Sequence, residues 1–416
     1  MATSEKDKEI LRGLGERIAG TAALPIQREK ADMWRRLNGL ERVKPMIWVN
    51  EIPWHEMDVN DELRLQTTDP FCRGLEGQLR RTIYQWEHMR GDMVVENVIH
   101  SPLVIRDTGL GVSEDVDIVR TDEKSSIVSR LFHPQIREEK DVEKIKMPQV
   151  THDVEASERN YQRMVDIFDG VIPVEKRGLP GMWFAPWDLL IRLWGVQEAM
   201  MDLALRPELV HHAMERLVSA HLHRLDQLEE LNLLSLNNSN VRIGSGGFGY
   251  CDELPQDDFD PAHIRTLDIW GCATAQIFSE VSPEMHEEFA LQYERRWLER
   301  FGLTYYGCCE PLDIKMQILR SIPNLRKISM SPWIDIDRAA EEVGDNYVFS
   351  LKPNPEVLGR DVWHPEIARK NLREALEKTK GCVVEIIMKD ISTVRYEPQR
   401  LWEWADIAME EAERVA

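Results

Sequence analysis

The sequence predicts an α/β protein, a (β/α)8 barrel of the TIM type, with an N-terminal helical extension and a β-hairpin insertion. Eight short apolar runs have the length and composition of buried strands, and helical patterns separate most of them. An open doubly wound sheet is the alternative. No Gly-x-Gly-x-x-Gly turn follows the first predicted strand, which disfavours that alternative.

The elements follow one another in a regular order. Residues 5–40 are predicted to be helical. The predicted strands are 45–50, 93–100, 181–186, 233–238, 303–308, 327–331, 347–351 and 382–388. The later helices are 196–230, 283–301, 335–343, 366–379 and 398–413. Alternating apolar residues at 115–133 predict a hairpin, which a charged connector follows at 136–146. The predicted organisation is a helical extension over 1–44 and a barrel over 45–416, with an insertion at about 104–148.

Composition limits the classes of function. The net charge of −21 argues against a nucleic-acid partner, because phosphate contacts need a basic surface. The apolar stretches are too short to span a membrane, and the charged N-terminus lacks the apolar core of a signal peptide. Six cysteines in 416 residues do not resemble a disulfide framework. We therefore expect a soluble cytoplasmic protein, and a homodimer remains open.

Polar residues at the ends of the predicted strands are the first candidates for a site, because barrel active sites lie at the carboxyl ends of strands. These residues are Asn50, Glu51, His100, Asn237, Asn238, Cys308, Glu310, Lys352, Lys389 and Asp390.

The run 303–311 is the most informative of these strand ends. A β-prone stretch leads into Cys308 and Cys309, then Glu310, and Pro311 ends the strand. Sulfur and oxygen donors on a rigid element suit Zn²⁺. The alternative is that both thiols are buried apolar side chains.

Two other features lie near the predicted strand ends. The glycine-rich segment 244–249 lacks the Lys-Ser/Thr of a phosphate-binding loop, so we expect a mobile loop over the site. Four tryptophans could form the wall of a pocket for a flat ring: Trp48, Trp54, Trp183 and Trp187.

Three segments carry a resemblance to a known family. They are 45–55 (Pro-Met-Ile-Trp-Val-Asn-Glu-Ile-Pro-Trp-His), 184–190 (Phe-Ala-Pro-Trp-Asp-Leu-Leu) and 282–285 (Ser-Pro-Glu-Met). Together they resemble the uroporphyrinogen decarboxylase superfamily over roughly residues 30–412. The resemblance implies a (β/α)8 barrel and two branches of chemistry, true decarboxylases and corrinoid-dependent methyltransferases.

The first strand argues against the decarboxylase branch. That branch carries Trp-x-Met-Arg-Gln-Ala-Gly-Arg, whose arginines bind a polycarboxylated porphyrinogen. Here the two arginine positions hold Glu51 and His55, and a carboxylate repels a polyanion. The aspartate that the family carries near its second strand has no clear match in 96–98.

The methyltransferase branch uses Zn²⁺ as a Lewis acid, commonly with a His-x-Cys pair and a later cysteine. Here Tyr306-Gly307-Cys308 lacks the histidine, and 385–390 lacks the cysteine. The resemblance to aromatic O-demethylases implies instead a mixed carboxylate–cysteine site with Glu280, Cys308 and Glu310 as metal ligands. The third ligand stays open among Cys309, Glu310 and Glu385.

The resemblance implies methyl transfer from a methoxylated aromatic substrate to the Co(I) corrinoid (cobalamin) of a partner protein, that is, O-demethylation. The implied catalytic residues are Glu51, His100 and Lys389, and the implied substrate-binding residues are Trp48, Asn50, Trp54, Trp187, Asn237 and Asn238. Two other functions remain open: a lyase or decarboxylase acting on another small molecule, and a non-enzymatic binding barrel.

Overall fold

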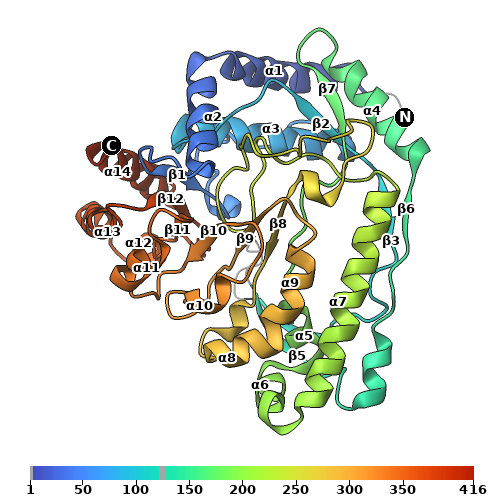
Figure 1. Cartoon of the computed structure of the whole chain (residues 1–416). Coiled ribbons are helices and arrows are strands. Elements are labelled where there is room, and N and C mark those ends of the chain that lie inside the picture. The colour runs from blue at the N-terminus through green and yellow to red at the C-terminus, as the bar shows by residue number, and fades with distance from the viewer. Residues whose placement is uncertain (1–2, 121–127) are drawn as a thin grey trace.

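The computed structural model describes residues 3–120 and 128–416, and its largest sheet is a parallel sheet of six strands (Figure 1). In spatial order these are β1 (Met46–Val49), β12 (Val383–Met388), β11 (Val348–Leu351), β10 (Leu325–Met330), β9 (Leu303–Tyr306) and β8 (Trp270–Ala273). Every residue of β8, β9, β11 and β12 is buried. Burial on both faces explains why most of these strands are apolar runs in the sequence.

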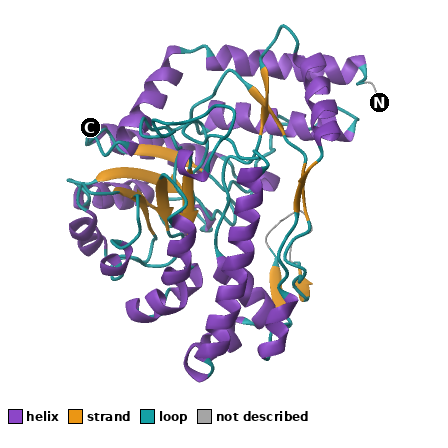
Figure 2. Cartoon of the chain, turned by 45° about the vertical axis from the view of Figure 1, so that its right-hand side comes forward, coloured by secondary structure: helices purple, strands orange, loops and turns teal. Residues whose placement is uncertain are grey.

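The other strands of the described residues form three separate pairs, which lie apart from the six-stranded sheet (Figure 2). The pairs are β2 (Ile99–Pro102) with β7 (Val174–Arg177), β3 (Ile105–Asp107) with β6 (Val150–His152), and β4 (Val116–Val119) with β5 (Ser129–Phe132). The first pair is parallel and the other two are antiparallel. The β4–β5 pair confirms the predicted hairpin, whose residues 121–127 lie outside the described part of the chain.

The strand predictions are confirmed where the apolar run is continuous and corrected elsewhere. β1, β9, β10, β11 and β12 lie within or largely overlap the predicted runs 45–50, 303–308, 327–331, 347–351 and 382–388. In the predicted strand 93–100, the observed strand begins only at Ile99. The predicted strand 181–186 contains no strand, and α5 begins at its last residue, Pro186. The strand in that part of the chain is β7, which was not predicted. The described residues therefore form an α/β fold with a six-stranded parallel sheet. They do not show the complete eight-stranded barrel that the sequence predicts.

The side chain of Asn237 explains why the predicted strand 233–238 is mostly absent. Only Leu234 of this segment forms a bridge, to Leu179. Beside β8, the Asn237 amide replaces a backbone partner: Nδ2 donates to the Trp270 carbonyl (3.0 Å) and Oδ1 accepts from the Trp270 amide (2.8 Å). A side chain thus supplies the hydrogen bonds that a neighbouring strand would supply.

Helices surround the sheet, and proline sets many of their boundaries. The longer helices are α1 (Glu5–Ala22), α2 (Pro25–Asn38), α3 (Pro70–His88), α4 (Val154–Phe168), α5 (Pro186–Trp194), α6 (Val196–Leu205), α7 (Pro207–Glu230), α11 (Ile336–Val343), α13 (Pro365–Lys378) and α14 (Gln399–Arg414). Shorter helical pieces are α8 (Pro283–His286), α9 (Gln292–Leu298), α10 (Met316–Leu319), α12 (Glu356–Gly359), η1 (Trp54–Glu56), η2 (Glu139–Lys144), η3 (Thr266–Asp268), η4 (Gln276–Phe278) and the π-helical turn η5 (Glu287–Leu291).

Most predicted helices are present, although three of them are divided. The extension 5–40 forms α1 and α2, which separate before Pro25, and 196–230 forms α6 and α7, which separate before Pro207. Proline has no amide hydrogen and fits the first turn of a helix, so it starts a new helix here. The region 283–301 comprises α8, η5 and α9. None of the described helices has both the length and the apolar composition that crossing a membrane requires.

Candidate active site

A cavity of about 500 Å³ lies at the carboxyl ends of β1, β8, β9 and β12. Its lining comprises Glu51, Pro180, Gly181, Met182, Trp183, Asn237, Val241, Arg242, Ile243, Gly244, Ser245, Trp270, Gly271, Cys272, Gln276, Cys308, Lys389 and Asp390. A cavity of this volume suits a small molecule, and its position matches the usual location of sites at the ends of parallel strands.

The backbone after β9 holds Cys308 at the cavity. Gly307 has a φ of +96°, and a Cβ at this position would lie 2.5 Å from Leu312 Cδ1, so the turn requires glycine. The Cys308 amide donates to Glu310 Oε2 (2.9 Å), and Ser329 Oγ donates to the Cys308 carbonyl (2.8 Å). The position of the thiol is therefore fixed by contacts on both sides of its peptide unit.

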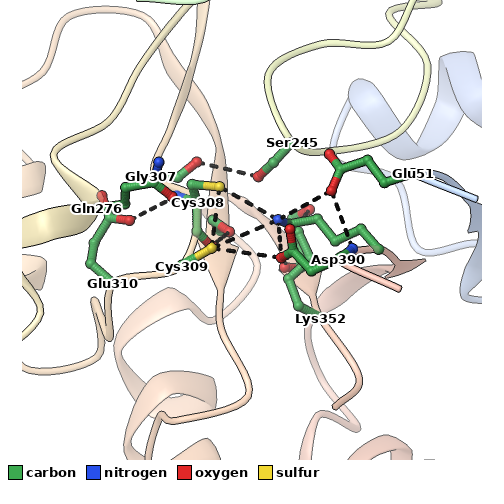
Figure 3. A network of polar contacts seen from close by, with 12 residues as sticks. Glu51, Ser245, Gln276, Gly307, Cys308, Cys309, Glu310, Lys352 and Asp390 are labelled. Atoms are coloured by element: carbon green, nitrogen blue, oxygen red, sulfur yellow. Dashed lines mark hydrogen bonds and ion pairs between the residues drawn. The ribbon is translucent and has the colours of Figure 1, made fainter. Parts of the chain in front are cut away.

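Two sulfurs and an ammonium group meet at this point (Figure 3). Cys308 Sγ and Cys309 Sγ lie 3.5 Å apart, and Lys389 Nζ lies 3.5 Å from the first and 3.8 Å from the second. The pKa of Cys308 is lowered, mainly because the Cys309 thiol donates a hydrogen bond to it; burial opposes this effect, and the Lys389 charge adds to it. The pKa of Cys309 is raised by the same pairing and by burial. Cys308 is thus the more readily ionised thiol.

Carboxylates complete a group of charged side chains that we call the cavity cluster: Glu51, Arg242, Cys308, Lys389 and Asp390. Arg242 Nη2 donates to Glu51 Oε1 (2.9 Å), and the Asp390 amide donates to Glu51 Oε2 (3.1 Å). Lys389 Nζ donates to Asp390 Oδ2 and lies 4.0 Å from Glu51. Burial opposes the charge of Lys389, but the neighbouring negative groups raise its pKa nevertheless, so it stays an ammonium at neutral pH.

A second group of polar side chains lies nearby, and we call it the buried cluster: Tyr305, Lys327, Ser350, Lys352 and Glu385. Glu385 accepts from Lys327 Nζ (2.9 Å) and from Ser350 Oγ (2.6 Å). Lys352 Nζ donates to Tyr305 Oη (3.0 Å) and Ser350 Oγ (2.6 Å). Burial lowers the pKa of Lys352 to about 7. Ser245, which lines the cavity, contacts Tyr305 Oη (2.9 Å) and so joins the two clusters.

The glycine-rich segment 244–249 is packed rather than loose. A Cβ at Gly244 would lie 2.4 Å from Tyr305, and one at Gly247 would lie 2.4 Å from Trp34. The Gly247 amide donates to Glu385 Oε1 (3.1 Å). The segment does line the cavity, but this packing argues against the mobile loop that the sequence led us to expect.

The predicted zinc ligands Glu280, Cys308 and Glu310 are not brought together. Glu310 is fully buried, and its oxygens accept from Thr274 Oγ1 (2.9 Å), the Ala275 amide (3.3 Å) and the Cys308 amide (2.9 Å). Glu280 is exposed and does not line the cavity. Near the two sulfurs the counter-charge is the Lys389 ammonium. The residues present therefore do not fit a zinc site with three protein ligands.

One potential metal-ligand group occurs among the described residues, and it lies elsewhere. Glu62, Glu87 and His88 each place a ligand atom within 4.8 Å of the others. None of the three lines the cavity, and acidic groups of this kind are common without a metal. No site is assigned to them.

The other predicted residues divide between the cavity and the packed interior. Four of the strand-end candidates line the cavity with Cys308, and so does Trp183; the four are Glu51, Asn237, Lys389 and Asp390. Trp187 is fully buried against Phe278 and donates to the Phe289 carbonyl (2.9 Å). The remaining candidates do not line the cavity. Trp48 packs on Phe248, and Trp54 lies edge-on to Tyr84. Asn238 donates to the Leu254 carbonyl, and Asn50 and His100 each have a buried side-chain nitrogen without a hydrogen-bond partner. Burial lowers the pKa of His100.

Several lining residues were not predicted. Trp270 and Cys272 belong to β8, which the sequence analysis missed, although 269–273 is a short apolar run between Asp268 and Thr274. Arg242 lies in an irregular segment, and its ion pair with Glu51 joins positions 191 residues apart. No local pattern reveals such a pair.

Comparisons with known proteins give a limited result. No family model matches the chain, and no curated protein matches it. A solved structure of a methyltransferase from Methanosarcina mazei is similar over 90% of this chain and 96% of that chain, with a TM-score of 0.49 and 13% sequence identity. A likeness of this strength assigns no activity to the chain.

Proposed function

We propose that this chain is a methyltransferase on a (β/α)8-type barrel, which moves a methyl group from a methoxylated aromatic compound to the corrinoid of a partner protein. The observation that carries the proposal is the open cavity at the strand ends, whose lining combines apolar side chains such as Met182 and Trp183 with the Lys389 ammonium. The sequence resemblance of 45–55, 184–190 and 282–285 to the superfamily supports the same function.

The walls of the cavity suit an aromatic ring. Trp183 and Met182 present flat or polarisable apolar surfaces to it. Trp183 is 47% exposed, whereas Trp270 is 1% exposed and its indole donates to the Gly249 carbonyl (2.9 Å). A ring could thus lie against Trp183 and Met182, with its substituents directed toward Arg242 and Glu51.

The chemical requirement is stabilisation of the leaving oxygen. When the methyl–oxygen bond breaks, its electron pair stays on oxygen and forms a phenolate, while the methyl group passes to the partner's corrinoid. Lys389 can donate a hydrogen bond to this oxygen from inside the cavity. Because the pKa of Lys389 is raised above its usual value, the ammonium stabilises the anion as an ion pair and keeps its proton.

The corrinoid would belong to the partner, and when the partner is bound it would supply the nucleophile that accepts the methyl group. This chain must then hold the ether in a cavity that is open toward the partner. The proposal includes no step through zinc, because the cysteines and carboxylates present do not form a three-ligand site.

The test is reaction of the purified chain with reduced corrinoid, supplied as cob(I)alamin or as a corrinoid protein, and a panel of methoxybenzenes. Loss of the Co(I) absorbance measures methyl transfer. Lys389→Met should lower the rate by about 10²-fold, as expected for removing one donor to a developing oxyanion. Lys389→Arg should retain more activity, and Lys370→Met, at an exposed position on α13, should have no effect.

Two outcomes would overturn the proposal. Demethylation without any corrinoid would indicate another chemistry, such as that of a lyase. The absence of reaction with every ether in the panel would favour a binding barrel without enzymatic activity.

A further inference from the structure

Two adjacent thiols, of which Cys308 lines the cavity, have no role in the proposed methyl transfer. Neither Cys308 nor Cys309 forms a disulfide bond, and their sulfurs lie 3.5 Å apart. Cys308 lines the cavity and is 6% exposed. The Lys389 ammonium and the second sulfur beside it distinguish Cys308 from Cys272, which also lines the cavity.

The two sulfurs have different charged neighbours. Lys389 Nζ lies closer to Cys308 Sγ, at 3.5 Å, and an ammonium at this distance stabilises a thiolate. Cys309 Sγ lies 3.6 Å from Asp390 Oδ2, so this carboxylate can accept the Cys309 proton once Cys308 no longer accepts it. One thiol is thus placed to attack and the other to lose a proton later.

Cys272 provides a contrast within the same cavity. Its sulfur donates to the Met182 carbonyl (3.3 Å), and burial raises its pKa to about 11. No ammonium group contacts it among the described residues. A location in the cavity therefore does not by itself make a thiol reactive here.

We propose that Cys308 and Cys309 are a nucleophile and a resolving thiol that reduce small, uncharged organic disulfides within the cavity. The charges of the cavity cluster are already paired with one another, and Met182 and Trp183 add apolar surface. A small neutral disulfide fits these surroundings better than a charged one. This activity goes beyond the proposed methyl transfer and does not depend on it.

The reaction balances in two steps. The Cys308 thiolate attacks one sulfur of the disulfide, forms a mixed disulfide and releases the other half as a thiolate. Cys309 then gives its proton to Asp390 and attacks Cys308 Sγ, so that a Cys308–Cys309 disulfide forms and the second half leaves as a thiolate. The electron pair of the dithiol has reduced one disulfide to two thiols. An added dithiol such as dithiothreitol would restore the reduced protein.

The test uses the full chain, reduced and freed of reductant, with bis(2-hydroxyethyl) disulfide as the probe. Wild-type protein should release two equivalents of 2-mercaptoethanol and form a disulfide within the peptide that contains 308–309, detected by mass spectrometry after acid quenching. Cys309→Ser should instead keep one hydroxyethylthio group on Cys308. Cys308→Ser should show neither product, and Cys382→Ser, outside the cavity, should behave as wild type.

A cysteine variant could lose activity only because it misfolds, so a further variant that keeps both thiols is needed. Lys389→Met should slow formation of the mixed disulfide by about 3- to 10-fold, because the loss of thiolate is partly offset by the greater nucleophilicity of the more basic thiol. Adducts on Cys272 in the same digest provide an internal reference. The proposal is overturned if Cys308→Ser releases thiol at the wild-type rate, or if the Cys309→Ser adduct lies mainly on another cysteine. The assay contains neither corrinoid nor ether, so its outcome is independent of methyl transfer.

Discussion

The cavity cluster and the buried cluster use similar charged residues, and a single strand contributes to both. Glu385 lies within β12, and Lys389 follows the end of the same strand. In the buried cluster, the side chains of Lys327 and Glu385 are both 0% exposed. In the cavity cluster, Arg242 and Glu51 are 27% and 38% exposed, and Lys389 faces two thiols. The Arg242–Glu51 and Lys327–Glu385 pairs thus differ mainly in their access to solvent.

This difference determines what each cluster can do. An ion pair sealed from water cannot replace a lost partner with solvent, so its residues are committed to the structure. A pair at an open cavity can exchange its partner for water or for a ligand, which is what a binding or reacting group requires. The comparison therefore assigns stability to the buried cluster and reactivity to the cavity cluster. Three predictions test this division.

The largest expected effect comes from breaking the buried ion pair. Glu385→Gln keeps the shape of the side chain and one acceptor but leaves the Lys327 charge without its partner. We expect the free energy of unfolding to fall by about 3–5 kcal/mol, measured by urea unfolding.

The double variant Lys327→Met/Glu385→Gln provides the control for this prediction. It removes both charges and should recover much of the lost stability. A cost below roughly 1 kcal/mol for Glu385→Gln alone would show that the buried cluster does not have the role assigned to it.

A smaller effect should appear in the pH dependence of stability. Burial lowers the pKa of Lys352 to about 7, whereas an unfolded lysine has a pKa of roughly 10.4. Between these values the unfolded chain binds a proton that the folded protein does not bind, so this residue makes stability rise with pH. Its contribution is on the order of 1 kcal/mol per pH unit.

Lys352→Met removes this titration. Urea unfolding of both proteins across the same pH window should show a rise in the wild type that is reduced in the variant. Parallel curves would mean that Lys352 keeps its proton in the folded protein, and the buried cluster would then carry one more positive charge than inferred.

The sequence predicted the parts of this fold that depend on local pattern. β9, β11 and β12 are found because each is a nearly continuous apolar run, whereas β10 is a short mixed segment in which Leu325, Ile328 and Met330 are the apolar residues. β8 is as short as β1, β9 and β11, but it contains glycine, which is disfavoured in strands, and it was missed. Its neighbour Asn237 pairs with it through a side chain. A rule about strand patterns does not describe a side chain that takes the place of a neighbouring strand's backbone.

The candidate site shows the same limit. Placing polar residues at strand ends identified Glu51, Asn237, Cys308 and Lys389, which all line the cavity. Proximity to a strand end does not reveal side-chain direction, so Trp187 was expected in a pocket wall and lies instead in the core. Partners far apart in sequence, such as Arg242 and Glu51, become visible only in the folded chain.

The smallest expected effect concerns this last pair and separates the two clusters most directly. Arg242→Met removes one charge of a pair that is 27% and 38% exposed, so we expect the free energy of unfolding to fall by less than about 1 kcal/mol. Raising the salt concentration to roughly 1 M shortens the screening length to about 3 Å, and the difference from wild type should then nearly vanish. The loss caused by Glu385→Gln should persist under the same conditions, because ions do not enter the buried cluster. Urea unfolding of wild type, Arg242→Met and Glu385→Gln at low and high salt measures both differences. A large effect of Arg242→Met that does not depend on salt would contradict the division between the two clusters. The Arg242–Glu51 pair would then act as part of the sealed interior.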